Sequence, residues 1–192
     1  MRRLLSIGLT LGLLAGLVAQ LALPRALKAA TESTDPEDEL KAATVLAFLQ
    51  NAKWLDAESG GPFLTVGVVG RPAISAALHR AIEGKTVNGR VVRILDLTLP
   101  ADPRCCQLLY VATDHKLDIR RALTGTAAAH VLTIGEANRF LEDGGAINLF
   151  LVDGHMAFEV SMAALDQCRV AIGSKLLRYG RVRDLAGQRG PG

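Results

Sequence analysis

Alternation of apolar runs with amphipathic stretches predicts a chain in which strands and helices follow one another. The run Phe63-Leu-Thr-Val-Gly-Val-Val69 is almost continuously apolar. Such runs are typical of strands buried on both faces of a parallel sheet. After Gly70, apolar residues recur at helical spacing from Ile74 to Ile82, which predicts a helix with one buried face. The alternation predicts an α/β fold with a largely parallel sheet.

The same patterns give approximate bounds for the other elements. A first helix is predicted from Pro36, behind a capping Asp35, to Lys53 or Trp54. Further strands are predicted over residues 91–95, 108–112 and 130–134, and further helices over residues 72–84, 116–123, 136–142 and 174–182.

Asp153-Gly154, between two apolar runs, is a strong signal for a two-residue β-hairpin turn. The turn sets a register that pairs Val152 with His155 and continues to Ile147 with Val160. One face of this C-terminal antiparallel hairpin is then wholly apolar, with Ile147, Leu149, Leu151, Met156, Phe158 and Val160. The other face carries Asn148, Phe150, Val152, His155, Ala157 and Glu159.

The mixed face of the hairpin has two interpretations. In the first, it is a solvated or helix-covered face in which Asn148 hydrogen-bonds Glu159 across the strands. Alternatively it binds a partner, since an aromatic residue such as Phe150 on an exposed polar face is typical of interface anchors. Ser161 is a candidate cap for a following helix that contains Leu165.

The first thirty residues have the pattern of an export signal. Arg2 and Arg3 precede a stretch from Leu4 to Leu23 that has no charged residue. We therefore assign residues 1–30 to a signal peptide, with an uncleaved membrane anchor as the alternative. Residues 1–30 hold four basic and no acidic residues, so the formal net charge of +3 becomes −1 without them. The remainder is not basic, which argues against a nucleic-acid partner.

The chain has three cysteines, Cys105, Cys106 and Cys168. Export permits a disulfide. A bond from Cys168 to Cys106 or to Cys105 is more plausible than one between the adjacent pair. The alternative is that the thiols are buried and inert.

The sequence offers no positive argument for catalysis. Its four histidines are scattered without a metal-ligand spacing, so no metal site and no cofactor are expected. Asp153, His155 and Ser161 are the residue types of a catalytic triad, but their placement along a hairpin disfavours one. We therefore expect a protein that is not an enzyme.

An ordered set of segments carries a resemblance to a known family. Three of them together are fairly specific: Gly84-Lys-Thr-Val-Asn-Gly-Arg90, Gly144-Gly-Ala-Ile-Asn-Leu149 and Ser174-Lys-Leu-Leu-Arg178. The others lie at residues 40–54, 65–70, 106–111, 131–136 and 158–160. With these segments in this order, the chain resembles the YfiR family, also described as DUF4154, over residues 39–183. The chain departs from the family in having Leu55 after Trp54, where a proline is common, and in having too few cysteines for two disulfides.

The resemblance implies a Rossmann-like layered fold for a domain over residues 39–185, after a linker and helix start at residues 31–38. It also implies a periplasmic regulator that binds the sensor region of an inner-membrane GGDEF diguanylate cyclase and represses cyclic-di-GMP synthesis. The family's Phe-Glu-apolar motif falls on Phe158 to Val160. We therefore expect partner-binding residues at Glu159, Asn148, Phe150 and Leu165.

Two alternatives stay open beside this interpretation. One is a sensor of a small ligand, bound near Gly70 and Thr113, where strands of a parallel sheet end. The other is an accessory subunit of a different membrane signalling complex. A homodimer is compatible with each of them.

Overall fold

A computed structural model describes residues 35–55 and 61–183 of the chain. Its strands are β1 (Ala52–Trp54), β2 (Phe63–Gly70), β3 (Thr86–Val87), β4 (Arg90–Leu97), β5 (Leu108–Ala112), β6 (Leu132–Gly135), β7 (Ile147–Val152), β8 (His155–Ser161), β9 (Val170–Ile172) and β10 (Arg181–Arg183). Its helices are α1 (Pro36–Asn51), α2 (Pro72–Ile82), the 3-10 turn η1 (Pro103–Cys105), α3 (Lys116–Leu123), α4 (Met162–Gln167) and α5 (Ser174–Leu177).

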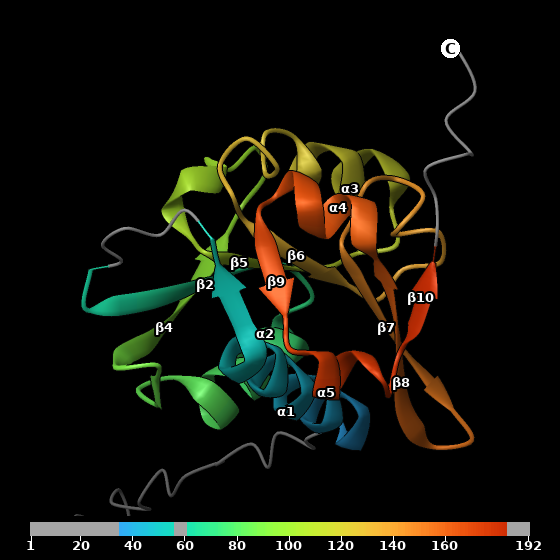
Figure 1. The fold of residues 1–192 in the computed structure, drawn as a ribbon, viewed down its shortest axis with the longest axis horizontal. Coiled ribbons are helices and arrows are strands. Elements are labelled where there is room, and N and C mark those ends of the chain that lie inside the picture. Colours follow the sequence, from blue (N-terminus) through green and yellow to red (C-terminus); the bar gives the residue numbers. More distant parts are fainter. Residues whose placement is uncertain (1–34, 56–60, 184–192) are drawn as a thin grey trace, which may run out of the picture. The chain divides into compact units, whose positions relative to one another are not determined.

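The main sheet has the strand order β10-β8-β7-β6-β5-β2-β4-β3. Strands β4, β2, β5, β6 and β7 run parallel to one another, whereas β3 is antiparallel to β4 and β8 returns antiparallel to β7. Helices α1 and α2 lie together on one side of this sheet (Figure 1). The predicted α/β fold, with a largely parallel sheet and a C-terminal antiparallel hairpin, is confirmed.

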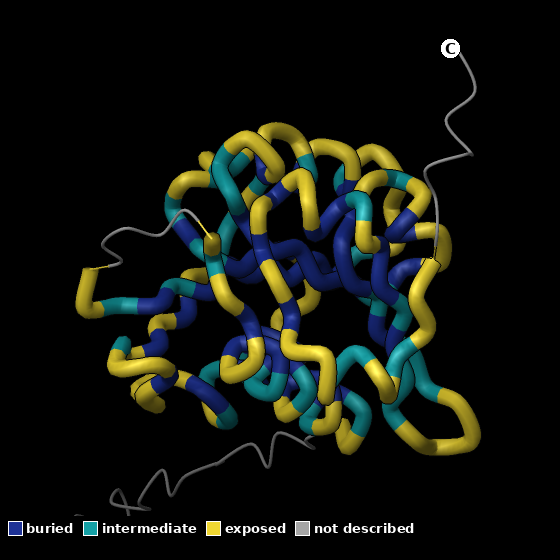
Figure 2. The backbone as a smooth tube through the Cα atoms, viewed as in Figure 1, coloured by how far each residue is buried: buried dark blue, intermediate teal, exposed yellow. Residues whose placement is uncertain are grey.

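The sheet separates two apolar clusters, because successive side chains of a strand point to opposite faces. In β5, Leu108 and Tyr110 belong to the larger cluster, whereas Leu109 and Val111 belong to the smaller one. Helices α1, α2 and α4 pack on the larger cluster, and α3 packs on the smaller one. The central strands are therefore buried on both faces, as their apolar runs predict (Figure 2).

The start of helix α1 follows the prediction, but its end does not. The side chain of Asp35 accepts a hydrogen bond from the Glu37 amide at 3.0 Å. The helix ends at Asn51, and the next three residues form strand β1, which pairs antiparallel with β9. This pairing joins segments more than a hundred residues apart, and no local pattern reveals it.

Two predicted helices are not formed. Residues 136–142 form a bend and turns, in which Arg139 has a positive φ of 70°. The predicted helix over residues 174–182 is only the four-residue α5, followed by strand β10 beside β8. A Cβ on Gly180 would lie 2.1 Å from the Phe158 ring, so the chain approaches β8 closely at this glycine.

The hairpin has the predicted register throughout, from Val152 opposite His155 to Ile147 opposite Val160. Asp153 and Gly154 both have positive φ angles, which is the geometry that a two-residue turn of this kind requires. The apolar face packs into the larger cluster, where Phe158 meets the Phe48 ring of α1 edge to face at 5.0 Å. Ser161 caps α4 by accepting a hydrogen bond from the Ala164 amide.

The disulfide prediction is wrong for this structure. All three cysteines are free thiols. Cys106 lies in the smaller apolar cluster and Cys168 in the larger one, on opposite faces of the sheet. Burial raises the pKa of Cys106 to about 12 and that of Cys168 to about 11, so both stay protonated at neutral pH. These two residues match the alternative of buried, inert thiols.

The predicted signal peptide and most of the linker lie outside the described residues. Within residues 35–55 and 61–183, no helix is both long enough and apolar enough to cross a membrane.

Candidate partner-binding site

The mixed face of the hairpin borders a polar cavity of about 420 Å³. Its lining includes three of the predicted partner-binding residues, Asn148, Phe150 and Glu159. The turn at residues 138–142 and Arg183 of β10 provide the remaining walls, together with Leu151. The three predicted residues come together because they lie on the same face of adjacent strands.

The turn that forms one wall of the cavity is anchored by Phe140. The ring of Phe140 is fully buried, and it lies between Gly135 and Gly145. A Cβ on Gly145 would lie 2.1 Å from this ring, and one on Gly135 would lie 2.5 Å from it. Two glycines therefore create the slot that fixes the turn above the hairpin.

Asn148 connects the hairpin to this turn. With its amide oriented so that donors meet acceptors, Asn148 donates to the carbonyls of Ala137 and Gly135 at 3.2 Å each. The cross-strand partner expected for it, Glu159, is instead paired with Arg183. Asn148 therefore positions the cavity wall, and its donors are already used.

Among the residues that the structure describes, Glu159 has one weak ion pair. Its two carboxylate oxygens lie 3.4 Å from a guanidinium nitrogen of Arg183. Arg181 is the neighbour of Glu159 in the register between β10 and β8, and residues paired in this way point to the same face. The carboxylate therefore lies at the rim of the cavity between two arginines, with capacity for further hydrogen bonds.

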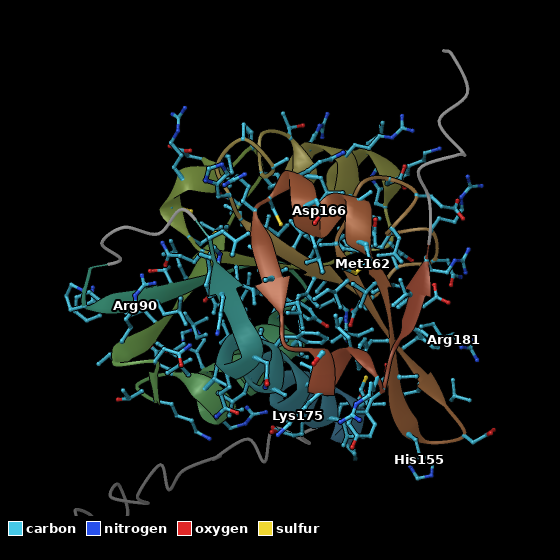
Figure 3. All side chains as sticks on the ribbon, in the orientation of Figure 1. Arg90, His155, Met162, Asp166, Lys175 and Arg181 are labelled. Atoms are coloured by element: carbon cyan, nitrogen blue, oxygen red, sulfur yellow. The ribbon has the colours of Figure 1, made fainter. Side chains whose placement is uncertain are left out.

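Leu165 is wrong as a partner-contacting residue. Only 1% of its surface is exposed, because it packs into the larger apolar cluster under α4. The accessible residues of that helix include Met162 and Asp166, whose positions on α4 are labelled in Figure 3. The triad of Asp153, His155 and Ser161 is not assembled, because the first two lie at the hairpin tip and Ser161 lies at the other end of β8.

A second polar cluster, missed from the sequence, lies where β2, β5 and β6 end. Lys41 of α1 lies 2.6 Å from Glu136, and Arg71 lies 2.9 Å from both Glu136 and Asp38. The hydroxyl of Tyr110 donates to Glu136 at 3.0 Å. We call these five residues the buried ion-pair cluster.

Burial and charge act against each other in the buried ion-pair cluster. Burial alone would raise the pKa of Glu136, but hydrogen bonds and positive charge from Lys41 and Arg71 outweigh it and lower this pKa. Burial alone would lower the pKa of Lys41, but its bonds to Glu136 and Glu37 raise it. Both side chains are therefore held in their charged forms.

The cluster also occupies the position at which we expected a small ligand. Gly70 approaches the Ala112 carbonyl so closely that a Cβ would lie 2.2 Å from this oxygen. The amide of Arg71 donates to the same carbonyl at 3.1 Å. From there the Arg71 side chain extends to Glu136 and Asp38, so the chain's own side chains cover the strand ends next to Gly70.

Polar residues at the ends of parallel strands were the signal that could have revealed this cluster. Arg71 directly follows β2 and Glu136 directly follows β6, and the ends of parallel strands meet at one edge of a sheet. The acidic first turn of α1 is explained by helix capping alone, so Asp38 gave no sign that it reaches this edge. Arg139 was missed for a different reason, since it lies in the segment wrongly predicted as a helix at residues 136–142. Arg183 directly follows the segment wrongly predicted as a helix at residues 174–182, where the structure has strand β10.

Taken together, the geometry defines a layered α/β domain with a polar surface cavity at the end of its sheet. Comparison with family models then shows that the chain belongs to the family described as YfiR/HmsC-like (DUF4154), which matches residues 38–181. This is a regulatory family associated with the periplasm and with cyclic-di-GMP signalling.

The other comparisons add the fold alone. No curated protein matches the chain. A solved structure, described as a conserved domain protein from Vibrio cholerae O1 biovar El Tor, superimposes with a TM-score of 0.50 at 13% identity. The match covers 77% of this chain and 60% of that one.

Proposed function

We propose that this chain is an exported, non-enzymatic regulator of an inner-membrane GGDEF diguanylate cyclase. It binds the periplasmic sensor region of that enzyme and restrains cyclic-di-GMP synthesis. Family membership supports the signalling context. The observation that carries the binding surface is Glu159, a carboxylate at the rim of a polar cavity with one long ion pair at 3.4 Å.

The cavity suits a protein partner better than a reaction. Phe150 supplies an aromatic contact, and Glu159 and Arg183 supply charges of both signs within one surface. This mixture of an aromatic residue with arginine is typical of the centres of protein interfaces. Asn148 contributes indirectly, because its hydrogen bonds hold the turn that shapes the surface.

Replacement of Glu159 and Phe150 tests this function. We expect Glu159→Ala and Phe150→Ala to weaken capture of the purified sensor region and to raise cellular cyclic-di-GMP. Glu83→Ala is the matched control, because Glu83 is an exposed glutamate at the end of α2, away from the hairpin. If both hairpin variants behave like Glu83→Ala in both measurements, the surface assignment is wrong.

A second candidate function, sensing of a small ligand, is favoured by a different groove. This groove of about 530 Å³ lies between the end of α1 and the turn before β4. Ala52, Leu64 and Val87 give it a buried apolar floor, and Trp54 gives it an aromatic wall. A thermal shift across a metabolite panel that Trp54→Ala abolishes would support this function, and no shift with any metabolite would count against it.

A further inference from the structure

The chain from Lys175 to Arg183 carries four cations and no acid. We call this segment the basic strip. Arg183 pairs with Glu159, but Lys175, Arg178 and Arg181 make no ion pair with any residue in 35–55 or 61–183. Three positive charges without an ion pair to a described residue therefore lie within seven residues.

The basic strip also exposes two large apolar side chains. Tyr179 is 81% exposed and Val182 is 56% exposed. Single exposed apolar residues are common and need no explanation. An exposed tyrosine between Arg178 and Arg181 is a combination that recurs at binding hot spots. Val182 lies on the other face of β10, in register with buried Val160.

The backbone of the strip is held in place. Strand β10 pairs in parallel with β8, with Arg181 beside Glu159 and Arg183 beside Ser161. Gly180 lies against the Phe158 ring, which packs on Phe48 in the core. A partner would therefore meet a preformed surface, so little ordering of this backbone opposes binding.

The basic strip continues the candidate site. Arg181 and Arg183 lie on the same face of the sheet as Glu159, and Arg183 lines the cavity. In Figure 3 the Arg181 side chain points away from the fold beside the hairpin. Glu142 and Glu159 are the acids that line the cavity. Arg139, Arg183 and the adjacent Arg181 outnumber them, so the combined surface is positive.

We propose that the basic strip is the outer part of the partner interface and that it binds an acidic surface on the partner protein. Tyr179 packs against an apolar residue within that surface. The proposal rests on the proposed function, because it names the chemistry of the same partner. An anionic lipid surface is disfavoured, since one exposed tyrosine and one exposed valine give far less apolar area than a membrane-bound amphipathic helix.

The test measures binding of the purified, full-length mature chain to the purified periplasmic sensor region of the membrane GGDEF protein. We expect Arg181→Glu and Tyr179→Ala each to weaken binding about tenfold or more. Binding by the unaltered chain should fall as ionic strength rises, and Arg181→Glu should reduce this dependence. Tyr179→Phe keeps the aromatic contact and should bind nearly as well as the unaltered chain.

Two controls on α3 match these changes. Lys116→Glu reverses an exposed cation, and Leu117→Ala removes an apolar side chain that is exposed like Val182. We expect both to bind like the unaltered chain. Circular dichroism and the urea midpoint should be unchanged for all variants, because the replaced side chains are exposed.

The results separate the two proposals. If Glu159→Ala weakens binding but the strip variants do not, the basic strip is not part of the interface and the proposed function stands. If the unaltered chain does not bind the sensor region, the proposed function fails. Vesicles of phosphatidylglycerol and phosphatidylethanolamine test the lipid alternative. Loss of vesicle binding by the strip variants, with unchanged binding to the sensor region, would overturn the proposal in favour of a membrane.

Discussion

Glu136 and Glu159 are two glutamates of similar exposure in very different surroundings. Their side chains are 13% and 18% exposed. Glu136 accepts bonds from Lys41, Arg71 and Tyr110 at 2.6 to 3.1 Å. Within residues 35–55 and 61–183, the charged partner of Glu159 is Arg183 alone, at 3.4 Å. Exposure alone therefore does not identify a binding carboxylate, whereas the number of bonds that the chain itself supplies does distinguish the two.

The difference assigns opposite roles to the two residues. The carboxylate of Glu136 joins α1, β2 and β5 at one edge of the sheet, so its loss should harm folding. Glu159 joins only β8 and β10, so its loss should spare folding and harm binding. Each of the following predictions tests one part of this contrast.

The largest expected effect follows removal of the buried carboxylate. Glu136→Ala leaves Lys41, whose side chain is 6% exposed, with Glu37 as its one remaining acidic partner in the described part of the chain. Breaking a buried ion pair in this way costs about 3–5 kcal/mol of unfolding free energy. Urea unfolding followed by circular dichroism measures it. If Glu136→Ala lowers the free energy of unfolding no more than Glu159→Ala does, the two glutamates do not differ in their contribution to folding.

The contribution of Glu136 to the free energy of unfolding should fall as the pH becomes acidic. Because its pKa is lower in the folded chain than the ordinary 4.5, its stabilisation is present above that value and is lost as pH falls through the folded pKa. Lys41, with a raised pKa, stabilises below 10.5 and loses this effect as pH rises through its folded pKa.

Glu136→Gln keeps the shape of the side chain and removes its charge. We expect the variant to be less stable at neutral pH and to lose less of its remaining stability between neutral and acidic pH than the unaltered chain. The measurement is the thermal midpoint across a pH series. If the thermal midpoints of the two proteins fall in parallel with pH, Glu136 does not account for the loss of stability at acidic pH.

The hairpin turn gives a smaller effect. Gly154 has a φ of 77°, and an alanine in this left-handed region costs about 1–2 kcal/mol. Gly154→Ala should therefore lower the free energy of unfolding by about this amount and also weaken partner binding. Asp153→Asn is the control, because Asn-Gly suits the same turn. Equal losses from both variants would argue against the turn geometry.

The smallest expected effect is at the candidate site itself. Glu159→Gln removes half of a long, partly exposed ion pair, and such pairs contribute about 0–1 kcal/mol. We expect a change in unfolding free energy below about 1 kcal/mol. Urea unfolding measures it, with Glu136→Gln examined in parallel. A loss as large as that of Glu136→Gln would make Glu159 a folding residue.

Local patterns predicted the parts of the fold that depend on neighbours in sequence. The Asp153-Gly154 turn fixed the whole hairpin register, and apolar runs located strands such as β2 and β5. Strands β1, β9 and β10 were missed because each depends on a distant partner, as in the pairing of Lys53 with Ala171. The helix predicted at residues 136–142 failed because Phe140 enters a slot made by glycines at both ends of the turn.

The candidate site was predicted in part for the same reason. Glu159, Asn148 and Phe150 share one hairpin face, and the alternation of side chains reveals this from sequence. Alternation does not show that the Asn148 amide donates its hydrogen bonds to the turn, or that Leu165 faces inward. The cluster around Glu136 needed knowledge of which strands are neighbours, and only the fold supplies that.

The slot around Phe140 has a consequence for how related chains diverge. Gly135 and Gly145 have room for hydrogen only, since a Cβ at either position would overlap the ring. We expect these three positions to change together during evolution, with larger residues at 135 or 145 appearing only where position 140 has become small. A relative with such a compensated exchange would carry a differently shaped wall beside its hairpin, and with it a different choice of partner.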